Sequence, residues 1–84
     1  MDREHILGLI KRHIVVNSHG LGTADIDPRR SMKDLGLSSL DIVEVVSSAM
    51  RELRIRIPRT GLANLASIDE LVDLFWHTKQ QQAA

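Results

Sequence analysis

The chain has 84 residues, 43% of them hydrophobic, with 11 Lys and Arg against 11 Asp and Glu and no Cys. This length suits one small domain, whose core can rely on neither disulfides nor Cys-based metal sites. The zero net charge gives no general attraction to nucleic acid, no apolar run is long enough to span a membrane, and the N-terminus lacks a signal-peptide cleavage pattern. We therefore expect a cytoplasmic protein that binds neither nucleic acid nor membranes.

Apolar residues at helical spacing predict a first helix over residues 3–16, ending near Asn17–Gly20. From about Ser18 to Leu37 no period is present, and Gly, Asn, Asp and Pro are frequent. A connection of roughly 20 residues is long for a compact domain. It keeps enough apolar residues for us to expect an ordered loop packed across the helices: Leu21, Ile26, Met32, Leu35 and Leu37.

The second helix is predicted from the serine pair Ser38–Ser39 to about Leu53 or Arg54. Its apolar residues form two adjacent rows, which indicates a central, well-buried helix. One row is Leu40, Val43, Val46 and Met50, and the other is Ile42, Val45, Ala49 and Leu53.

The remaining third of the chain predicts one extended connector and two helices. Residues 54–59 alternate charged and branched residues up to Pro58, so Ile55 and Ile57 should turn inward. A short third helix is expected at residues 59–65, and the last helix begins at Ser67, which forms a capping box with Glu70. We expect residues 79–84 to fray. The sum is a single all-α domain over residues 1–84, a small four-helix bundle with three longer helices, one short helix and a long ordered loop between helices one and two.

The serine pair lies where the loop meets the second helix. Ser38 stands three residues before Asp41, as in a capping box, which leaves Ser39 at the first helical position. The positive end of a helix dipole favours an attached phosphate, and Gly36 permits a tight turn into the helix. These residues alone leave open whether Ser39 carries a group or only begins the helix. No nucleophile elbow or neighbouring base supports an enzyme.

The stretch "LGLSSLDIVEVV" resembles the attachment motif of acyl and peptidyl carrier proteins, Leu-Gly-x-Asp-Ser-Leu. The match is Leu35, Gly36, Ser39 and Leu40, and the helix order extends the resemblance over residues 3–78. It implies that a phosphopantetheinyl transferase moves 4′-phosphopantetheine from coenzyme A onto Ser39, with Ser38 as the helix cap beside it. Ser38 replaces the usual Asp of the motif.

The same resemblance implies a recognition surface on the second helix, formed by Leu40, Asp41 and Glu44. Its partners would be enzymes that load and process acyl groups, of the ketosynthase or acyltransferase type. Carriers of primary fatty acid synthesis are similar to one another in having an acidic second helix and following loop. In that region this chain instead has four arginines: Arg51, Arg54, Arg56 and Arg59. An ordinary solvated surface is an equally good interpretation of these arginines. We therefore expect a carrier of specialised polyketide or related biosynthesis, with the arginines tuning partner choice.

Two alternatives remain from the sequence: a discrete aminoacyl or peptidyl carrier, and a helical interaction module without a cofactor. The four histidines lack metal-ligand spacing, so no metal site is expected. The Met1 start and short tail favour a free-standing chain, which we expect to be a monomer. Ala49 and Ala63 are candidates for leaving space for a bound acyl chain between helices two and three.

Overall fold

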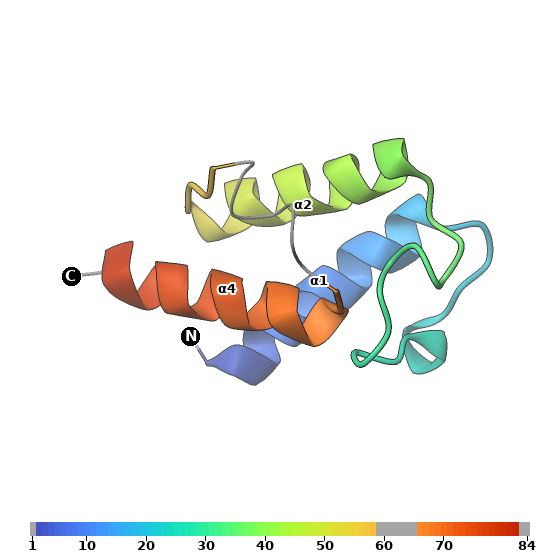
Figure 1. Cartoon of the computed structure of the whole chain (residues 1–84), viewed down its shortest axis with the longest axis horizontal. Coiled ribbons are helices and arrows are strands. Elements are labelled where there is room, and N and C mark those ends of the chain that lie inside the picture. Colours follow the sequence, from blue (N-terminus) through green and yellow to red (C-terminus); the bar gives the residue numbers. More distant parts are fainter. Residues whose placement is uncertain (1, 59–65, 83–84) are drawn as a thin grey trace.

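The computed structural model describes residues 2–58 and 66–82 and contains three α-helices and a 3-10 turn (Figure 1). These are α1 (Arg3–Asn17), η1 (Thr23–Asp25), α2 (Ser39–Leu53) and α4 (Ile68–Gln82). No strand occurs in these two ranges, so the all-α prediction is confirmed. The short helix expected at residues 59–65 lies outside the described residues, and the four-helix count stays a prediction.

Side-chain caps explain where α1 and α4 begin. The Asp2 carboxylate accepts a hydrogen bond from the backbone N–H of His5 at 2.8 Å, which caps α1. At α4 the Ser67 hydroxyl accepts from the Glu70 N–H at 3.2 Å, and the Glu70 carboxylate accepts from the Ala66 N–H at 2.6 Å. The predicted cap at Ser67 is therefore confirmed, with the carboxylate reaching one residue further back than in a standard capping box.

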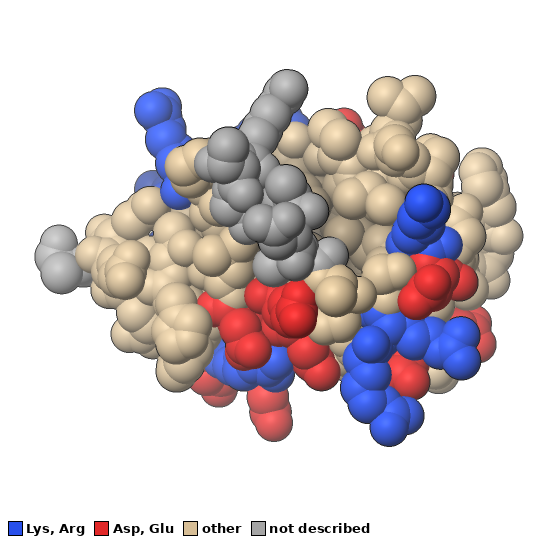
Figure 2. Space-filling view, viewed as in Figure 1, with Lys and Arg blue, Asp and Glu red and all other residues tan. Residues whose placement is uncertain are grey.

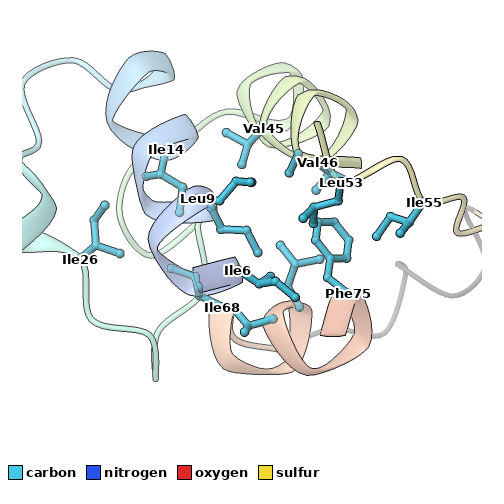
Figure 3. Packing of buried hydrophobic residues seen from close by; sticks show 14 of the residues in the cluster. Ile6, Leu9, Ile14, Ile26, Val45, Val46, Leu53, Ile55, Ile68 and Phe75 are labelled. Atoms are coloured by element: carbon cyan, nitrogen blue, oxygen red, sulfur yellow. The ribbon is translucent and has the colours of Figure 1, made fainter. Parts of the chain in front are cut away.

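The core forms where α1 packs against both α2 and α4 (Figure 3). Phe75 of α4 is fully buried and points toward Leu53 of α2 (Figure 3). Ile55 is also buried, as expected for the connector after α2. The buried residues of the three helices are Ile6, Leu9, Ile10 and Ile14 of α1, Val45, Val46, Ala49 and Leu53 of α2, and Ile68, Leu71, Val72 and Phe75 of α4.

One apolar row of α2 is only partly in this core. Leu40 is 83% exposed and Val43 is 58% exposed, although the sequence placed both in a buried row. The buried residues of α2 face the core, whereas Leu40 and Val43 lie on the outer side of its first turns. The prediction of a well-buried helix is thus wrong for these two residues.

The long loop between α1 and α2 is ordered, as predicted. Ile26 and Leu37 are buried, and Leu21, Met32 and Leu35 pack against the core. The loop also holds the start of α4, because the Arg30 and Pro28 carbonyls accept hydrogen bonds from the N–H groups of Ile68 at 2.9 Å and Asp69 at 2.8 Å. Two of the N–H groups that a helix leaves unpaired at its start are satisfied in this way.

The C-terminal end of α4 extends further than the sequence suggested. The helix continues to Gln82, so the expected fraying from residue 79 is wrong for residues 79–82. The Lys79 ammonium donates to the Leu53 carbonyl at 2.9 Å, and the Gln82 amide donates to the Arg56 carbonyl at 3.2 Å. These bonds join the last turns of α4 to the end of α2.

Candidate functional site

The start of α2 is closed by a complete capping box. The Ser38 hydroxyl accepts a hydrogen bond from the Asp41 N–H at 3.2 Å, and the Asp41 carboxylate accepts from the Ser38 N–H at 3.1 Å. The geometry predicted for Ser38 and Asp41 is therefore present. Ser39 is the first residue of the helix, and its side chain is exposed.

A tight turn in the loop leads into this helix start. The N–H groups of Leu35 and Leu37 both donate to the Met32 carbonyl, at 3.1 and 3.2 Å. Gly36 between them has a φ of 92°, in the left-handed region that favours glycine. A Cβ on Gly36 would meet nothing within 4 Å, so the backbone and not crowding requires glycine here. The turn buries Leu37 and leaves Ser38 and Ser39 at the surface.

Asp41 is held in its charged form at this helix start. The hydrogen bond from the Ser38 N–H is the main cause that lowers the pKa of the Asp41 carboxyl below its ordinary value, followed by the Ser38 hydroxyl contact. A weaker contribution to the lowered pKa comes from the charge of His19 in the loop after α1. His19 and Asp41 line one small hollow, a neighbourhood that the sequence did not reveal.

Leu40 and Glu44 lie on the exposed side of α2, close to the serine pair. The Glu44 carboxylate accepts a hydrogen bond from the Ser48 hydroxyl at 3.0 Å, one turn further along the helix. Val43 is exposed beside Leu40, since residues three apart are neighbours on a helix surface. Sequence reasoning missed Val43 as a surface residue, because its apolar character fits a core position equally well.

The predicted arginines lie at the other end of α2. Arg51 is in the last turn, Arg54 is the C-cap residue, and Arg56 follows in the connector; all three are exposed. Figure 2 shows Lys and Arg side chains at the upper left, near the C-terminal end of α2 in Figure 1. At 1.5 Å per residue, Arg54 lies about 20 Å along the axis from Ser39. The structure thus separates these arginines from the serine pair, and Arg59 lies outside the described residues.

The described ranges contain neither a metal-binding cluster nor a membrane-spanning helix. Across residues 2–58 and 66–82, no group of three or more His, Asp or Glu side chains is placed to hold a metal ion. In the same ranges, every helix is too short or too polar to cross a lipid bilayer.

Comparison with known families identifies the arrangement at the start of α2. The family model "Phosphopantetheine attachment site" matches residues 14–75, which is more than half of the chain. The chain belongs to the acyl carrier protein family. This carrier is 36% identical over 75 residues to the acyl carrier protein of Acidothermus cellulolyticus, with 87% of each chain covered.

Two further similar proteins are carriers named for biosynthetic pathways. It is 25% identical over 80 residues to the polyketide biosynthesis acyl-carrier-protein AcpK of Bacillus subtilis, covering 95% of this chain and 98% of that one. Among solved structures it is similar to the acetyl-donor carrier in complex with the HMG synthase of the curacin biosynthetic pathway. That match has a TM-score of 0.82 and 34% identity, and covers 92% of this chain and 99% of the other.

As a family member the protein is a carrier and not an enzyme, and its prosthetic group is 4′-phosphopantetheine. The start of α2 fits the phosphate of this group. In the part of the chain that the structure describes, the N–H groups of Ser39 and Leu40 have no hydrogen-bond acceptor. Free N–H groups at the positive end of a helix dipole favour an anion.

Proposed function

We propose that Ser39 carries the 4′-phosphopantetheine arm of this acyl carrier. The observation that supports this is the difference between the two serine hydroxyls. The Ser38 hydroxyl accepts the capping hydrogen bond, whereas the exposed Ser39 hydroxyl has no hydrogen-bond partner among the described residues. Ser39 is therefore free to react without loss of the helix cap.

In the proposed modification, the Ser39 oxygen forms a new bond to the phosphorus that carries pantetheine in coenzyme A. The bond from that phosphorus to the adenosine bisphosphate breaks, and the serine hydroxyl loses its proton to the transferase. The new phosphodiester keeps one negative charge beside the free N–H groups at the start of α2. When bound, the arm supplies a thiol that holds acyl groups as thioesters.

We also propose that Leu40, Asp41 and Glu44 meet the enzymes that modify, load and unload the carrier. They follow Ser39 in the first two turns of α2, and the exposed Leu40 gives them an apolar contact. Ketosynthases and acyltransferases are the proposed partner types. The polyketide carrier among the relatives and the arginines after α2 support a specialised biosynthetic role. The single core shared by the described helices supports one carrier domain over residues 1–84.

Intact mass after incubation with coenzyme A and a broad-specificity phosphopantetheinyl transferase tests the role of Ser39. We expect the wild-type chain and the matched Ser38→Ala variant each to gain one phosphopantetheinyl group, and Ser39→Ala to gain none. Modification of Ser39→Ala to the wild-type extent would contradict the proposal. A folded wild-type chain that gains nothing would favour the interaction module without a cofactor.

A groove between α2 and the start of α4 offers a place for the acyl chain. Its volume is about 730 Å³, within the range of about 300–1,000 Å³ for ligand pockets. Among the described residues, most of its lining is apolar: Met32, Ile42, Val43, Val46, Met50, Ile57, Ile68 and Leu71. Ala49 is buried in the core and does not line this groove, and Ala63 lies outside the described residues. We propose this groove in place of the space expected beside Ala49.

Methyl NMR of the loaded carrier tests the groove. We expect an octanoyl thioester to shift the methyl signals of Ile42, Val46 and Leu71, because an apolar chain gains by leaving water. An acetyl thioester is the matched control, since it is too short to reach the groove. Identical spectra for the two loaded forms would rule the groove out.

A further inference from the structure

One face of α2 runs from the serine pair to the arginines. At 100° per residue, five side chains of α2 fall within one outward strip of the helix, and the exposed C-cap residue Arg54 follows at its end; the five are Leu40, Val43, Glu44, Ser47 and Arg51. We call this strip, together with Arg54, the docking face. All of these residues are partly or wholly exposed, and none of them forms an ion pair with α1. Glu52, on another side of α2, pairs with Arg12 and His13 of α1. The docking face therefore points away from α1.

The charges on this face are divided between its ends. Glu44 lies on its N-terminal half and Asp41 flanks it, whereas Arg51 and Arg54 lie on its C-terminal half and Arg56 follows just beyond. None of these three arginines forms an ion pair within residues 2–58 and 66–82. By contrast, Arg3, Arg12 and Arg29 each pair with a carboxylate of the chain.

Distance keeps the two ends electrically separate. The acidic pair and the three arginines are centred on the order of 15 Å apart along α2, at 1.5 Å per residue. The Debye length at physiological salt is about 8 Å, so the acidic end does not neutralise the basic end. Lys79 strengthens the basic end, because its ammonium binds the Leu53 carbonyl beside the arginines. A partner surface that lies along α2 therefore meets a negative electrostatic potential at one end of the helix and a positive one at the other.

We propose that the docking face binds partner enzymes that carry a patch of carboxylates about 20 Å from the mouth of the channel that receives the arm. This rests on the proposed attachment at Ser39, which fixes the end of α2 at the channel mouth. Leu40 and Val43 supply the apolar contact near the mouth, and Arg51, Arg54 and Arg56 reach the carboxylates. A partner that is basic at that distance is repelled.

A purely structural role for the arginines makes a different prediction. Cations at a helix C-terminus interact favourably with the dipole, typically by about 0.3–1 kcal/mol. Such a role changes the stability of α2 but gives no preference between partners. The experiment therefore measures partner preference directly and records stability separately.

The probe is one ketosynthase of known structure, prepared in two forms. One form carries Lys or Arg about 20 Å from its channel mouth, and in the other form these residues are replaced by Glu. The association rates of the unmodified carrier with both forms are measured by interferometry at low salt. Using the unmodified carrier keeps this result independent of Ser39, whose modification is decided by mass alone.

We expect the wild-type carrier to associate roughly tenfold faster with the acidic form, within the range by which charge steers association. The Arg51→Glu/Arg54→Glu variant should reverse this order. Lys11→Glu is the matched control, since it changes the same kind of charge on α1 outside the docking face, and it should keep the wild-type order. Circular dichroism confirms that each variant is folded.

Equal rates of the wild-type carrier with the two ketosynthase forms would overturn the proposal. So would a folded Arg51→Glu/Arg54→Glu variant that keeps the wild-type order. A change in melting temperature without a change in partner preference would assign the arginines to the helix dipole alone.

Discussion

The two serines at the start of α2 are neighbours in the chain but differ in their contacts. Ser38 has an extended backbone and its hydroxyl closes the helix, whereas Ser39 already has helical geometry and an exposed side chain. Ser38 stands where the carrier motif usually has Asp. Ser and Asp are about equally good N-caps, so this replacement preserves the helix start while removing one charge beside Ser39.

Ser38→Ala should lower the stability of the protein by about 1 kcal/mol, because the Asp41 N–H loses its capping acceptor. For a domain of this size, that loss lowers the melting temperature by about 4–8 °C. Thermal unfolding followed by circular dichroism measures it. Ser39→Ala is the matched control and should melt close to wild type; an equal loss in both variants would contradict the assigned cap.

Arg54 ends α2 in the left-handed region, with a φ of 56°. The Arg54 N–H donates to the Arg51 carbonyl at 3.3 Å and the Ile55 N–H donates to the Met50 carbonyl at 3.1 Å, as in a Schellman motif. A non-glycine residue is strained in this conformation, which glycine adopts freely. The position therefore combines a structural cost with a charge at the end of the docking face.

Arg54→Gly should raise the stability by about 0.5–1 kcal/mol, because it removes this strain. Urea unfolding followed by the fluorescence of Trp76, the only tryptophan, measures the change. Arg54→Ala removes the same charge but keeps a Cβ, so it should show no such gain. If both variants were equally stabilised, the charge and not the backbone would be the cause.

At the scale of elements, α1 is joined to both of its neighbours by ion pairs. Arg12 and His13 contact the Glu52 carboxylate of α2 at 2.6 and 3.0 Å. Arg3 binds Asp69 and Asp73 of α4 at 3.1 and 2.5 Å. All of these groups are partly exposed, so solvent screens each pair and each adds little stability. These ion pairs instead help to orient the helices and make the stability of the protein depend on pH.

Glu52 should make part of the stability depend on pH. The hydrogen bond from His13, followed by the contact with Arg12, holds the pKa of the Glu52 carboxyl below its ordinary value of 4.5. Because the pKa is lowered only in the folded state, the ionised Glu52 carboxylate stabilises the fold fully above its ordinary pKa of 4.5. This stabilisation is lost as the pH falls from there through the lowered folded-state pKa. Near neutral pH, wild type should therefore have a higher melting temperature than the Glu52→Gln variant.

Melting temperatures measured from pH 7 down to about pH 3 test this. The difference in melting temperature between wild type and Glu52→Gln should become smaller as the pH falls below about 4.5. Glu44→Gln is the matched control on the exposed face of α2, and it should give no comparable narrowing. A difference that stays constant over the whole range would show that Glu52 acts through packing and not through its charge.

At the scale of the whole molecule, local signals predicted most of the fold. Helical spacing and the caps at Ser38 and Ser67 indicated α1, α2 and α4 to within a few residues, and Ile26 and Leu37 indicated that the loop is ordered. The motif around Ser39 pointed to the acyl carrier family, which the comparisons show. These features depend on neighbours in the chain, which a sequence displays directly.

Features that depend on distant parts of the chain were not predictable. The exposure of Leu40 and Val43 depends on which side of α2 the rest of the chain covers, and helical spacing does not contain that information. The order of α4 to Gln82 depends on carbonyl groups near the end of α2, far away in sequence. The loop carbonyls that cap α4 are likewise backbone groups, which no residue type reveals.

The central claim is that the arm is attached to Ser39 and not to its neighbour. Fragmentation mass spectrometry of the modified wild-type chain tests it most directly, because backbone cleavage between Ser38 and Ser39 separates the two serines. We predict that the phosphopantetheinyl mass stays with the fragments that contain Ser39 and is absent from those that end at Ser38. Finding that mass on fragments ending at Ser38 would contradict the account, because the residue that caps α2 would then carry the arm.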